Sequence, residues 1–230
     1  MNLQPVAPEI WSASRPLRFL GVEVGTRMTV VKLDGGGLFV HSPIALTPEL
    51  REEVDALGTV AAIVAPNLYH HLFAGEWAKA YPKASISCCP GLPKKRPDVA
   101  WSRELGDEPE SEWKATFDQV CFRALAIQNE IVFFHRKTKT MISSDVVFDL
   151  ASHPSAMTRA ASWVFGNRTP GPTILERLLI RDRAAALEQI GRMVAWGADR
   201  IVLAHGPSVE TNGSAVLEKG YAWLRPSGGR

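Results

Sequence analysis

The amino-acid sequence predicts an α/β protein in which helices cover the sheets. Strand and helix patterns alternate from residue 28 to residue 89, and three strand patterns follow one another between residues 120 and 148. A helix, a strand and a further helix complete the chain after residue 182. Alternating strands and helices are typical of right-handed crossovers, which place helices against the outer face of a sheet.

The N-terminal part of the chain, residues 9–40, is rich in strand patterns and contains a hairpin. Residues 28–33 alternate with the period of a strand, and residues 38–40 form a second apolar strand. Residues 34–37, Asp-Gly-Gly-Gly, lie between them and tolerate the positive φ angles that hairpin turns need. We therefore expect these two strands to pair.

A helix and a buried strand come next. Thr47 can cap a helix, Pro48 suits its first position, and apolar residues recur at helical spacing as far as residue 57. The apolar run at residues 60–65 stops at Pro66 and has the composition of a buried strand.

The remaining elements follow from similar patterns, and no linker argues for a second domain, so we expect a single domain over residues 1–230. The predicted strands lie at residues 85–89, 120–125, 130–135, 140–148 and 200–204. One predicted helix ends near residue 81, and two others cover residues 182–196 and 211–224. Residues 94–116 are predicted to form a surface loop around one or two short strands, and residues 226–230 a disordered tail.

Residues 151–181 have no clear period, because aromatic and apolar side chains alternate there with proline and glycine. Such a stretch in a compact domain is often a lid over a site or an interface segment. A surface excursion with short helices is the other interpretation. An interface in this segment would support a homodimer.

Composition limits the classes of function. A net charge of +2 gives no basis for expecting nucleic acid or an acidic membrane as a partner. No apolar stretch approaches the length of a membrane span, and the N-terminus lacks the features of a signal peptide. Cys88, Cys89 and Cys121 show no Cys-x-x-Cys spacing, which indicates reduced thiols. We therefore expect a cytoplasmic protein with a small-molecule substrate that the sequence does not name.

Polar residues stand at the points where several apolar strands end: His41, His70, His71, Asp145 and His205. The C-terminal ends of buried strands are where α/β proteins tend to place their sites. Imidazole nitrogens together with carboxylate oxygens suit Zn, Fe or Mn better than Ca or Mg. A strand-end aspartate can also simply cap a turn, and adjacent histidines diverge in direction, so one of the pair could lie outside a site.

These residues and the order of elements resemble the metallo-β-lactamase fold superfamily over most of the chain. The matching pieces are the hairpin strand ending at His41, the turn ending in His70-His71, Ser144-Asp145-Val146, and Leu203-Ala204-His205-Gly206. The turn is most similar to that of an uncharacterised branch, a domain-of-unknown-function family that reads P-N-x-x-H-H. The resemblance implies a four-layer αββα sandwich.

The superfamily's turn motif, H-x-H-x-D-H, is only partly present. With His71 in its last position, Pro66 and Leu68 replace the first two histidines, and His70 replaces the aspartate. No histidine lies between residues 121 and 131 to serve as the third ligand of the first metal site.

The resemblance therefore implies one divalent metal ion in a centre of the second-site type, with Zn preferred and Fe or Mn as alternatives. The implied ligands are His70, His71, Asp145 and His205, and the implied catalytic residues are Asp145 and His41, the latter to orient a ligand or carry a proton.

Two functions fit this sequence. The first is a metal-dependent hydrolase with a single metal centre. The second is a catalytically degenerate binding or scaffold protein that holds no metal. Retention of Asp145 and His205 favours the hydrolase, whereas loss of the first-site histidines favours the scaffold. We favour the hydrolase.

Overall fold

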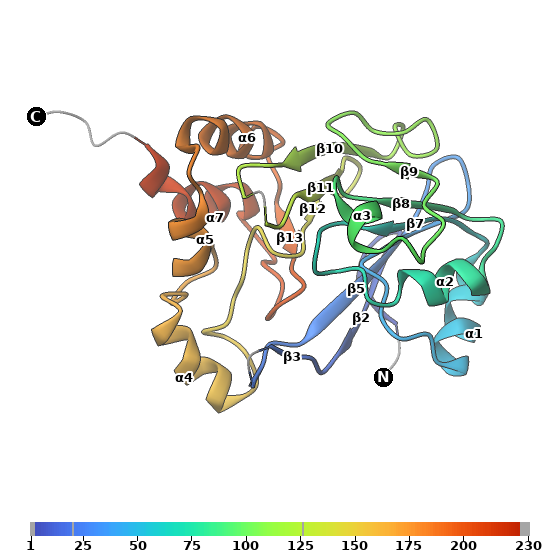
Figure 1. Cartoon of the computed structure of the whole chain (residues 1–230), viewed down its shortest axis with the longest axis horizontal. Helices are drawn as coiled ribbons and strands as arrows, with labels where there is room; N and C mark the ends of the chain where they lie inside the picture. Colours follow the sequence, from blue (N-terminus) through green and yellow to red (C-terminus); the bar gives the residue numbers. More distant parts are fainter. Residues whose placement is uncertain (1–2, 20, 126, 226–230) are drawn as a thin grey trace, which may run out of the picture.

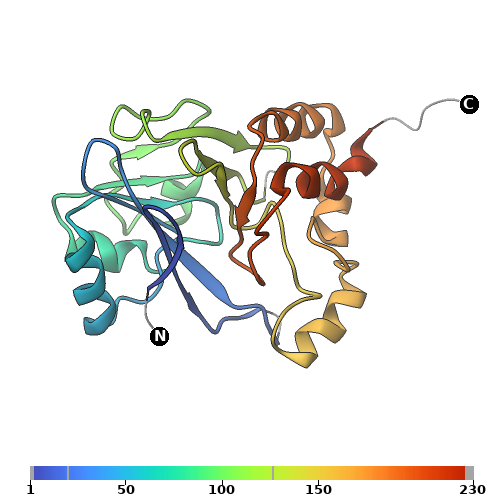
Figure 2. The ribbon, with the colours of Figure 1, turned by 180° about the vertical axis from the view of Figure 1, so that it is seen from behind.

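The computed structural model describes residues 3–19, 21–125 and 127–225, and two facing β-sheets organise them (Figure 1). Helices α1 (Pro48–Leu57) and α2 (Ala74–Ala80) lie on the outer side of the larger sheet. Helices α6 (Arg183–Ala195) and α7 (Gly213–Gly220) lie on the outer side of the smaller sheet, as the view from behind also shows (Figure 2). The predicted four-layer αββα sandwich is confirmed.

The larger sheet changes from antiparallel to parallel pairing at its centre. Its order is β1-β2-β5-β6-β7-β8-β9, antiparallel as far as β6 and parallel from β6 onward. Its strands are β1 (Gln4–Ala7), β2 (Ile10–Arg15), β5 (Thr26–Lys32), β6 (Leu38–His41), β7 (Val60–Ala65), β8 (Ser85–Cys88) and β9 (Arg103–Glu104). A separate small ribbon pairs β3 (Arg18–Phe19) with β4 (Val22–Glu23).

The smaller sheet has the order β10-β11-β12-β13, with a single parallel pair, β12 and β13, at one edge. Its strands are β10 (Phe117–Phe122), β11 (Glu130–His135), β12 (Thr140–Ile142) and β13 (Arg200–Val202). The other helical segments of the described chain are α3 (Leu92–Lys95), α4 (Ala156–Val164), α5 (Ile174–Leu179) and the 3-10 turn η1 (Ala222–Leu224).

Alternation along the strands distributes the apolar side chains among three packed layers. In β6, Phe39 faces the opposite sheet while Leu38 and Val40 face α1 and α2. In β11, Ile131 and Phe133 enter the inter-sheet layer, whereas their neighbours in the strand pack beneath α6 and α7. This is the period of two that a pleated strand imposes, and it explains why both sheets are buried on both faces.

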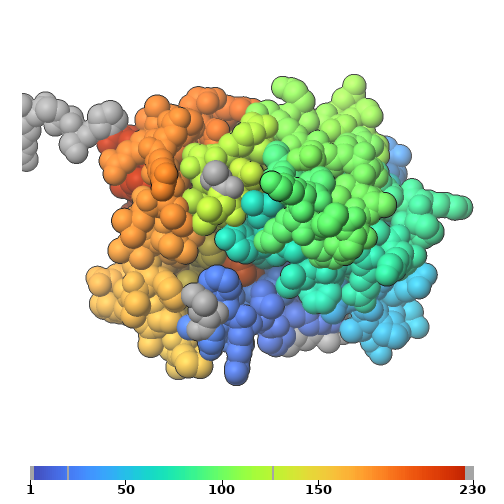
Figure 3. All heavy atoms as spheres, in the orientation of Figure 1, coloured from blue at the N-terminus to red at the C-terminus, as the bar shows by residue number. Residues whose placement is uncertain are grey.

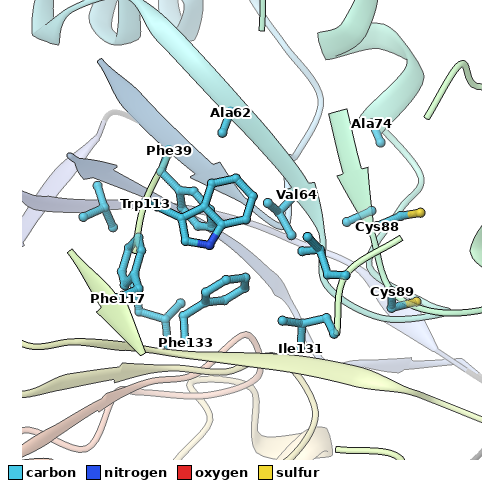
Figure 4. Close-up of a cluster of buried hydrophobic side chains, with 14 of the residues drawn as sticks. Phe39, Ala62, Val64, Ala74, Cys88, Cys89, Trp113, Phe117, Ile131 and Phe133 are labelled. Carbon is cyan, nitrogen blue, oxygen red and sulfur yellow. The ribbon is translucent and has the colours of Figure 1, made fainter. Parts of the chain in front are cut away.

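Aromatic rings join the two sheets at the centre of the inter-sheet core (Figure 4). The ring of Phe39 lies 5.3 Å from that of Trp113, 4.9 Å from that of Phe117 and 5.0 Å from that of Phe133, all in edge or tilted contacts. Tilted and edge-to-face pairs are the preferred arrangement of such rings. The sheets are therefore held by a dense layer of aromatic contacts.

Most predicted elements are present, but several boundaries differ. The predicted hairpin of residues 28–40, the helix capped by Thr47 and the strand at residues 60–65 are confirmed. The first strand of the second hairpin begins at residue 117, earlier than predicted, and the final predicted helix divides into α7 and η1. The predicted tail, residues 226–230, lies outside the described residues.

The predicted strand at residues 140–148 is wrong beyond Ile142, and the reason is a buried carboxylate. The backbone N–H groups of Ser144 and Asp145 donate to the two oxygens of Glu130, at 2.7 and 2.6 Å, instead of to a neighbouring strand. The chain therefore leaves the sheet, and Asp145 sits in an irregular turn. Across the described part of the chain, no helix is long and apolar enough to cross a membrane.

Candidate metal centre

Three of the predicted site residues meet at one edge of the sandwich. His70 follows β7, Asp145 follows β12 and His205 follows β13. Because β12 and β13 are parallel, their C-terminal ends reach the same edge, which is how Asp145 and His205 become neighbours. Of the groups of three or more His, Cys, Asp or Glu in the described residues, this is the one whose ligand atoms lie close enough to share a metal ion.

The three ligand atoms form a nearly regular triangle. His205 Nε2 lies 3.0 Å from Asp145 Oδ1 and 3.1 Å from His70 Nε2, and the third side, His70 Nε2 to Asp145 Oδ1, is 3.4 Å. All three side chains are buried, with at most a tenth of their surface exposed. The atoms therefore converge on one point in a largely water-excluded place.

His205 is held with its Nε2 atom facing the triangle. Its Nδ1 atom lies 2.8 Å from the carbonyl oxygen of Gly25, which can only accept, so Nδ1 must carry the proton. The ring of Phe148 stacks against the imidazole at 5.4 Å. The guanidinium of Arg27, on β5, donates to Leu203 O, Gly206 O and Ser208 Oγ and ties this turn to the other sheet.

Gly206 lets the His205 turn approach the Asp149 backbone. Its φ is +97°, and a Cβ atom at this position would lie 2.1 Å from the carbonyl oxygen of Asp149. The His205 carbonyl accepts a hydrogen bond from Asp149 N at 3.0 Å. Only glycine fits this close contact, because any side chain would push the turn away.

His70 is held through its other ring nitrogen and through its backbone. Its Nδ1 atom is 2.7 Å from Ser42 Oγ, and Ser42 has φ +53°, a left-handed conformation that costs a non-glycine residue free energy. The His70 N–H donates to Asn67 Oδ1 at 2.8 Å. Strained residues of this kind cluster at functional sites, and here the strain places a hydroxyl against a candidate ligand.

Asn67 and Glu130 support the cluster from behind. The Asn67 amide donates to Asp145 Oδ2 at 2.7 Å and to Glu130 Oε2 at 3.1 Å, while its oxygen accepts from the Tyr69 and His70 N–H groups. Glu130 also accepts from Ser143 Oγ at 2.7 Å. Neither Asn67 nor Glu130 exposes any surface. Hydrogen bonds of this kind orient metal-ligating side chains in many proteins.

The sequence patterns predicted no role for Ser42, Asn67 or Glu130. Asn67 is part of the P-N-x-x-H-H turn, so a signal was present, although its pattern is also that of an ordinary turn. Glu130 begins an apolar strand, where a glutamate is usually read as solvent-exposed. Ser42 follows His41 directly, and only the structure shows that the serine, and not the histidine, contacts His70.

The electrostatics of the cluster favour an ionised carboxylate beside imidazole. Burial raises the pKa of the Asp145 carboxyl, but His70 and His205 lower it by more, so that it lies well below its usual range. Burial lowers the pKa of His205, and the hydrogen bond and charge of Asp145 raise it above its ordinary value. Burial and the charge of Asp145 raise the pKa of Glu130.

The residues present fit a divalent metal ion. Because His205 Nδ1 is the donor to Gly25, the neutral ring presents its Nε2 lone pair to His70 Nε2 and a carboxylate oxygen, and a divalent cation there would replace the proton that Asp145 otherwise stabilises on Nε2. Ligand atoms of a tetrahedral zinc site, with bonds of about 2.0–2.1 Å, lie about 3.3–3.4 Å apart. The triangle of 3.0, 3.1 and 3.4 Å is close to that size.

His71 lies outside the triangle, contrary to its assignment in the turn motif. Its Nδ1 atom is 3.1 Å from an Arg96 nitrogen, which can only donate, so Nδ1 accepts and Nε2 carries the proton. Burial, and then the charges of Lys95 and Arg96, lower its pKa to about 4. His71 is therefore a neutral imidazole whose Nε2–H is a hydrogen-bond donor at the cavity wall.

With His70 as the last histidine of the turn motif, the first two histidine positions fall on Ala65 and Asn67, and the aspartate position on Tyr69. These side chains offer no imidazole either. The shift by one residue changes which histidine matches the last position, but either alignment leaves the first two positions of the motif without an imidazole.

His41 is buried away from the cavity. Its ring contacts Phe133 edge-on at 5.8 Å, and its Nε2 atom has no hydrogen-bond partner among the described residues. Burial, together with the nearby His70, lowers its pKa to about 3. His41, which the sequence predicts as a catalytic residue, is therefore not among the side chains that line the cavity.

A cavity of about 190 Å³ adjoins the triangle, and His70, Asp145 and His205 form part of its wall. A hollow is visible in Figure 3 where the blue, blue-green and yellow-to-orange parts of the chain meet. Residues 151–181 contribute Phe165, Leu175 and Glu176 to the wall. The segment that the sequence left unplaced is thus part of the cavity, and its role as a lid stays a prediction.

The sequence profile of a family described as Domain of unknown function (DUF4336) matches residues 7–174. No curated protein matches the chain. The match spans β2 through the first residue of α5 and includes two of the three residues in the triangle, His70 and Asp145.

Solved structures of metallo-β-lactamases share the fold over nearly the whole chain. A metallo-β-lactamase from Pontibacter korlensis is 12% identical, with a TM-score of 0.64 over 96% of this chain and 97% of that one. The metallo-β-lactamase FIM-1 from Pseudomonas aeruginosa, in its mono-zinc form, is also 12% identical, with a TM-score of 0.64 over 97% and 96%. The metal-soaked Flv1 flavodiiron core from Synechocystis sp. PCC6803 gives 12% identity and a TM-score of 0.67 over 96% of this chain and 60% of that one.

Proposed function

Because the chain belongs to the family Domain of unknown function (DUF4336) and has the metallo-β-lactamase fold, we propose that it is a metal-dependent hydrolase with a single metal centre. The observation that carries the proposal is the triangle of His70, Asp145 and His205 at the wall of a cavity. Its substrate is a small molecule with a hydrolysable carbonyl. The neighbours share the fold at low identity, so their substrates are not transferred to this chain.

We assign the metal to His70 Nε2, His205 Nε2 and Asp145 Oδ1, and we favour Zn, with Fe or Mn as alternatives. A divalent ion bound there would polarise a carbonyl and lower the pKa of a water molecule. Three protein ligands would leave a further position for water or substrate, as in catalytic rather than structural zinc sites. The centre is therefore suited to hydrolysis.

The protein's own residues prepare this chemistry. Gly25 O and Ser42 Oγ fix the two imidazole rings, and Asn67 holds Asp145 Oδ2 so that Oδ1 faces the histidines. His71 supplies a neutral N–H at the cavity wall that can donate to a substrate oxygen. Water adds to the acyl carbon, the bond to the leaving group breaks, and the leaving group takes the proton that water gives up.

The test compares Asp145→Asn with Asp149→Asn in a screen of p-nitrophenyl esters and thioesters after loading with Zn, Mn or Fe. Asp149 is a buried aspartate four residues away that accepts from Ser152 N and lies outside the triangle. We expect turnover that chelation abolishes, at least a hundredfold loss in Asp145→Asn and near-normal rates in Asp149→Asn. Rates that are equal in both variants, or that survive chelation, would contradict the proposal, and absence of turnover with every metal would favour the scaffold function.

A further inference from the structure

The cavity beside the triangle is lined mainly by apolar side chains. Leu17 and Phe19 reach it from the N-terminal ribbon, Phe148 and Leu150 from the turn after β12, and Phe165 from the end of α4. These segments are far apart in the sequence, so the apolar lining is assembled by the fold and does not come from one hydrophobic run. The lining that surrounds a cavity sets the chemistry of the ligand that it holds.

Large apolar side chains also gather around the mouth of this cavity. Phe19, Tyr69, Leu72, Ile127 and Leu175 line it and are each 45–56% exposed. They make up half of the large hydrophobic residues that the described chain exposes. Contiguous exposed apolar surface is unfavourable in water, so a protein that retains such a surface usually uses it for binding.

Apart from the proposed metal centre, the cavity wall offers no cation to an anionic ligand. Among the described residues that line it, none is a lysine or an arginine. Its carboxylates are Asp145, which faces the two histidines, and Glu176, whose Oε2 accepts from Thr173 N at 2.8 Å. A phosphate or carboxylate group in the apolar part of the cavity would lose its water without gaining the paired donors that recognise such groups.

The size of the cavity sets the length of the group that fits. A cavity of about 150 Å³ lined by apolar side chains holds benzene. In proportion, the 190 Å³ beside the triangle accommodates a group of roughly seven or eight carbon atoms.

We propose that this cavity binds an uncharged apolar acyl chain or aryl group of about seven or eight carbon atoms, and so selects neutral lipophilic esters, thioesters or lactones as substrates. The assignment of a reacting carbonyl rests on the proposed hydrolase function, whereas the binding of an apolar group does not. The carbonyl end of such a group lies toward His70, Asp145 and His205, and the rest fills the apolar part.

Helix α5 provides a matched pair of variants. Leu175 lines the cavity, and Leu178, one turn along the same helix and 74% exposed, does not. Leu175→Glu therefore places a charge at the mouth, and Leu178→Glu places the same charge on the same helix away from it. Both positions are exposed, so neither variant removes core packing.

The experiment measures the binding of straight-chain 1-alcohols from butanol to dodecanol by isothermal titration calorimetry. We expect affinity to rise about fourfold per methylene group up to about eight carbon atoms and then to level off. Leu175→Glu should weaken octanol binding at least tenfold, and Leu178→Glu should leave it unchanged. Absence of octanol binding, no dependence on chain length, or equal loss in the two variants would overturn the proposal.

A second arm follows kcat/KM for p-nitrophenyl esters from acetate to octanoate in the same three proteins. A rise with acyl length that Leu175→Glu abolishes supports the assignment of substrate class. Alcohol binding without hydrolysis of any ester would remove the hydrolase function but leave the apolar binding site intact. Hydrolysis without dependence on acyl length would remove the proposed selectivity and leave the hydrolase function intact.

Discussion

Asn67 offers the sharpest test of the network behind the metal centre. Its amide nitrogen is 2.7 Å from Asp145 Oδ2 and 3.1 Å from Glu130 Oε2, in a place with no exposed surface. The isosteric change Asn67→Asp keeps the acceptor for the Tyr69 and His70 N–H groups but puts a third carboxylate oxygen against the other two. The shape of the turn is preserved while its charge balance is not.

The cost can be estimated in two ways that agree. Two hydrogen bonds to carboxylates, each worth about 1.5–3 kcal/mol, are lost if all three groups stay ionised, which gives about 3–6 kcal/mol before repulsion is counted. If the new aspartate takes up a proton instead, holding it protonated at pH 7 against a pKa near 3.9 costs about 4 kcal/mol. Either value is a large part of the 5–15 kcal/mol that stabilises a typical domain.

The assay is urea unfolding followed by circular dichroism, together with metal content after reloading. Asn212→Asp is the control, because Asn212 is exposed and its φ of +57° suits aspartate as well as asparagine. We expect Asn67→Asp to lose about 4 kcal/mol and to bind metal at least tenfold more weakly, with Asn212→Asp within about 0.5 kcal/mol of the original protein. An Asn67→Asp protein with unchanged stability and metal content would refute this role for the network.

Three further results are expected. Gly206→Ala should reduce metal binding and stability together, because its Cβ would meet Asp149 O at 2.1 Å. Gly191→Ala is the control and should be neutral or stabilising, because a Cβ there meets nothing within 4 Å. Equal melting temperatures in the two variants would argue against the close contact. His41 stays neutral in the folded state with a pKa of about 3, so the unfolded state binds more protons below pH 6.5. Its contribution to stability should fall by about 2 kcal/mol between pH 7 and pH 5 in urea titrations, and the total fall should be smaller by about that amount in His41→Gln. Burial raises the pKa values of the three free thiols, to about 12 for Cys88 and about 11 for Cys121. Ellman's reagent should therefore label these thiols only after unfolding. Rapid labelling of the native protein would contradict their burial.

The sequence was sufficient to predict the fold wherever a short-range pattern decides the structure. The hairpin around residues 34–37, the Thr47 cap and the run at residues 60–65 depend on neighbours in the chain, and all are present. The end of β12 depends on Glu130, which accepts N–H groups fourteen and fifteen residues later. No pattern near Ser144 could reveal that interaction.

The site was predictable to the level of residue type and strand end, but not to the individual histidine. Asp145 and His205 follow adjacent parallel strands, a relation that topology supplies. The choice between His70 and His71 depends on how the turn is wound, which Asn67 Oδ1 determines by accepting from the N–H groups of Tyr69 and His70. Arg96, distant in the sequence, then engages His71. Both effects are tertiary, so sequence spacing alone could not indicate that His71 lies outside the triangle.

The most direct test of the metal centre is the metal content of His70→Ala beside that of His71→Ala. Both proteins are purified, stripped with chelator and reloaded with Zn, Mn or Fe before elemental analysis, and circular dichroism confirms that each is folded. The triangle predicts about one metal ion per chain in the original protein and in His71→Ala, and little or none in His70→Ala. Metal that is lost in His71→Ala and kept in His70→Ala, or that is absent from every protein after reloading, would contradict the centre described by His70, Asp145 and His205.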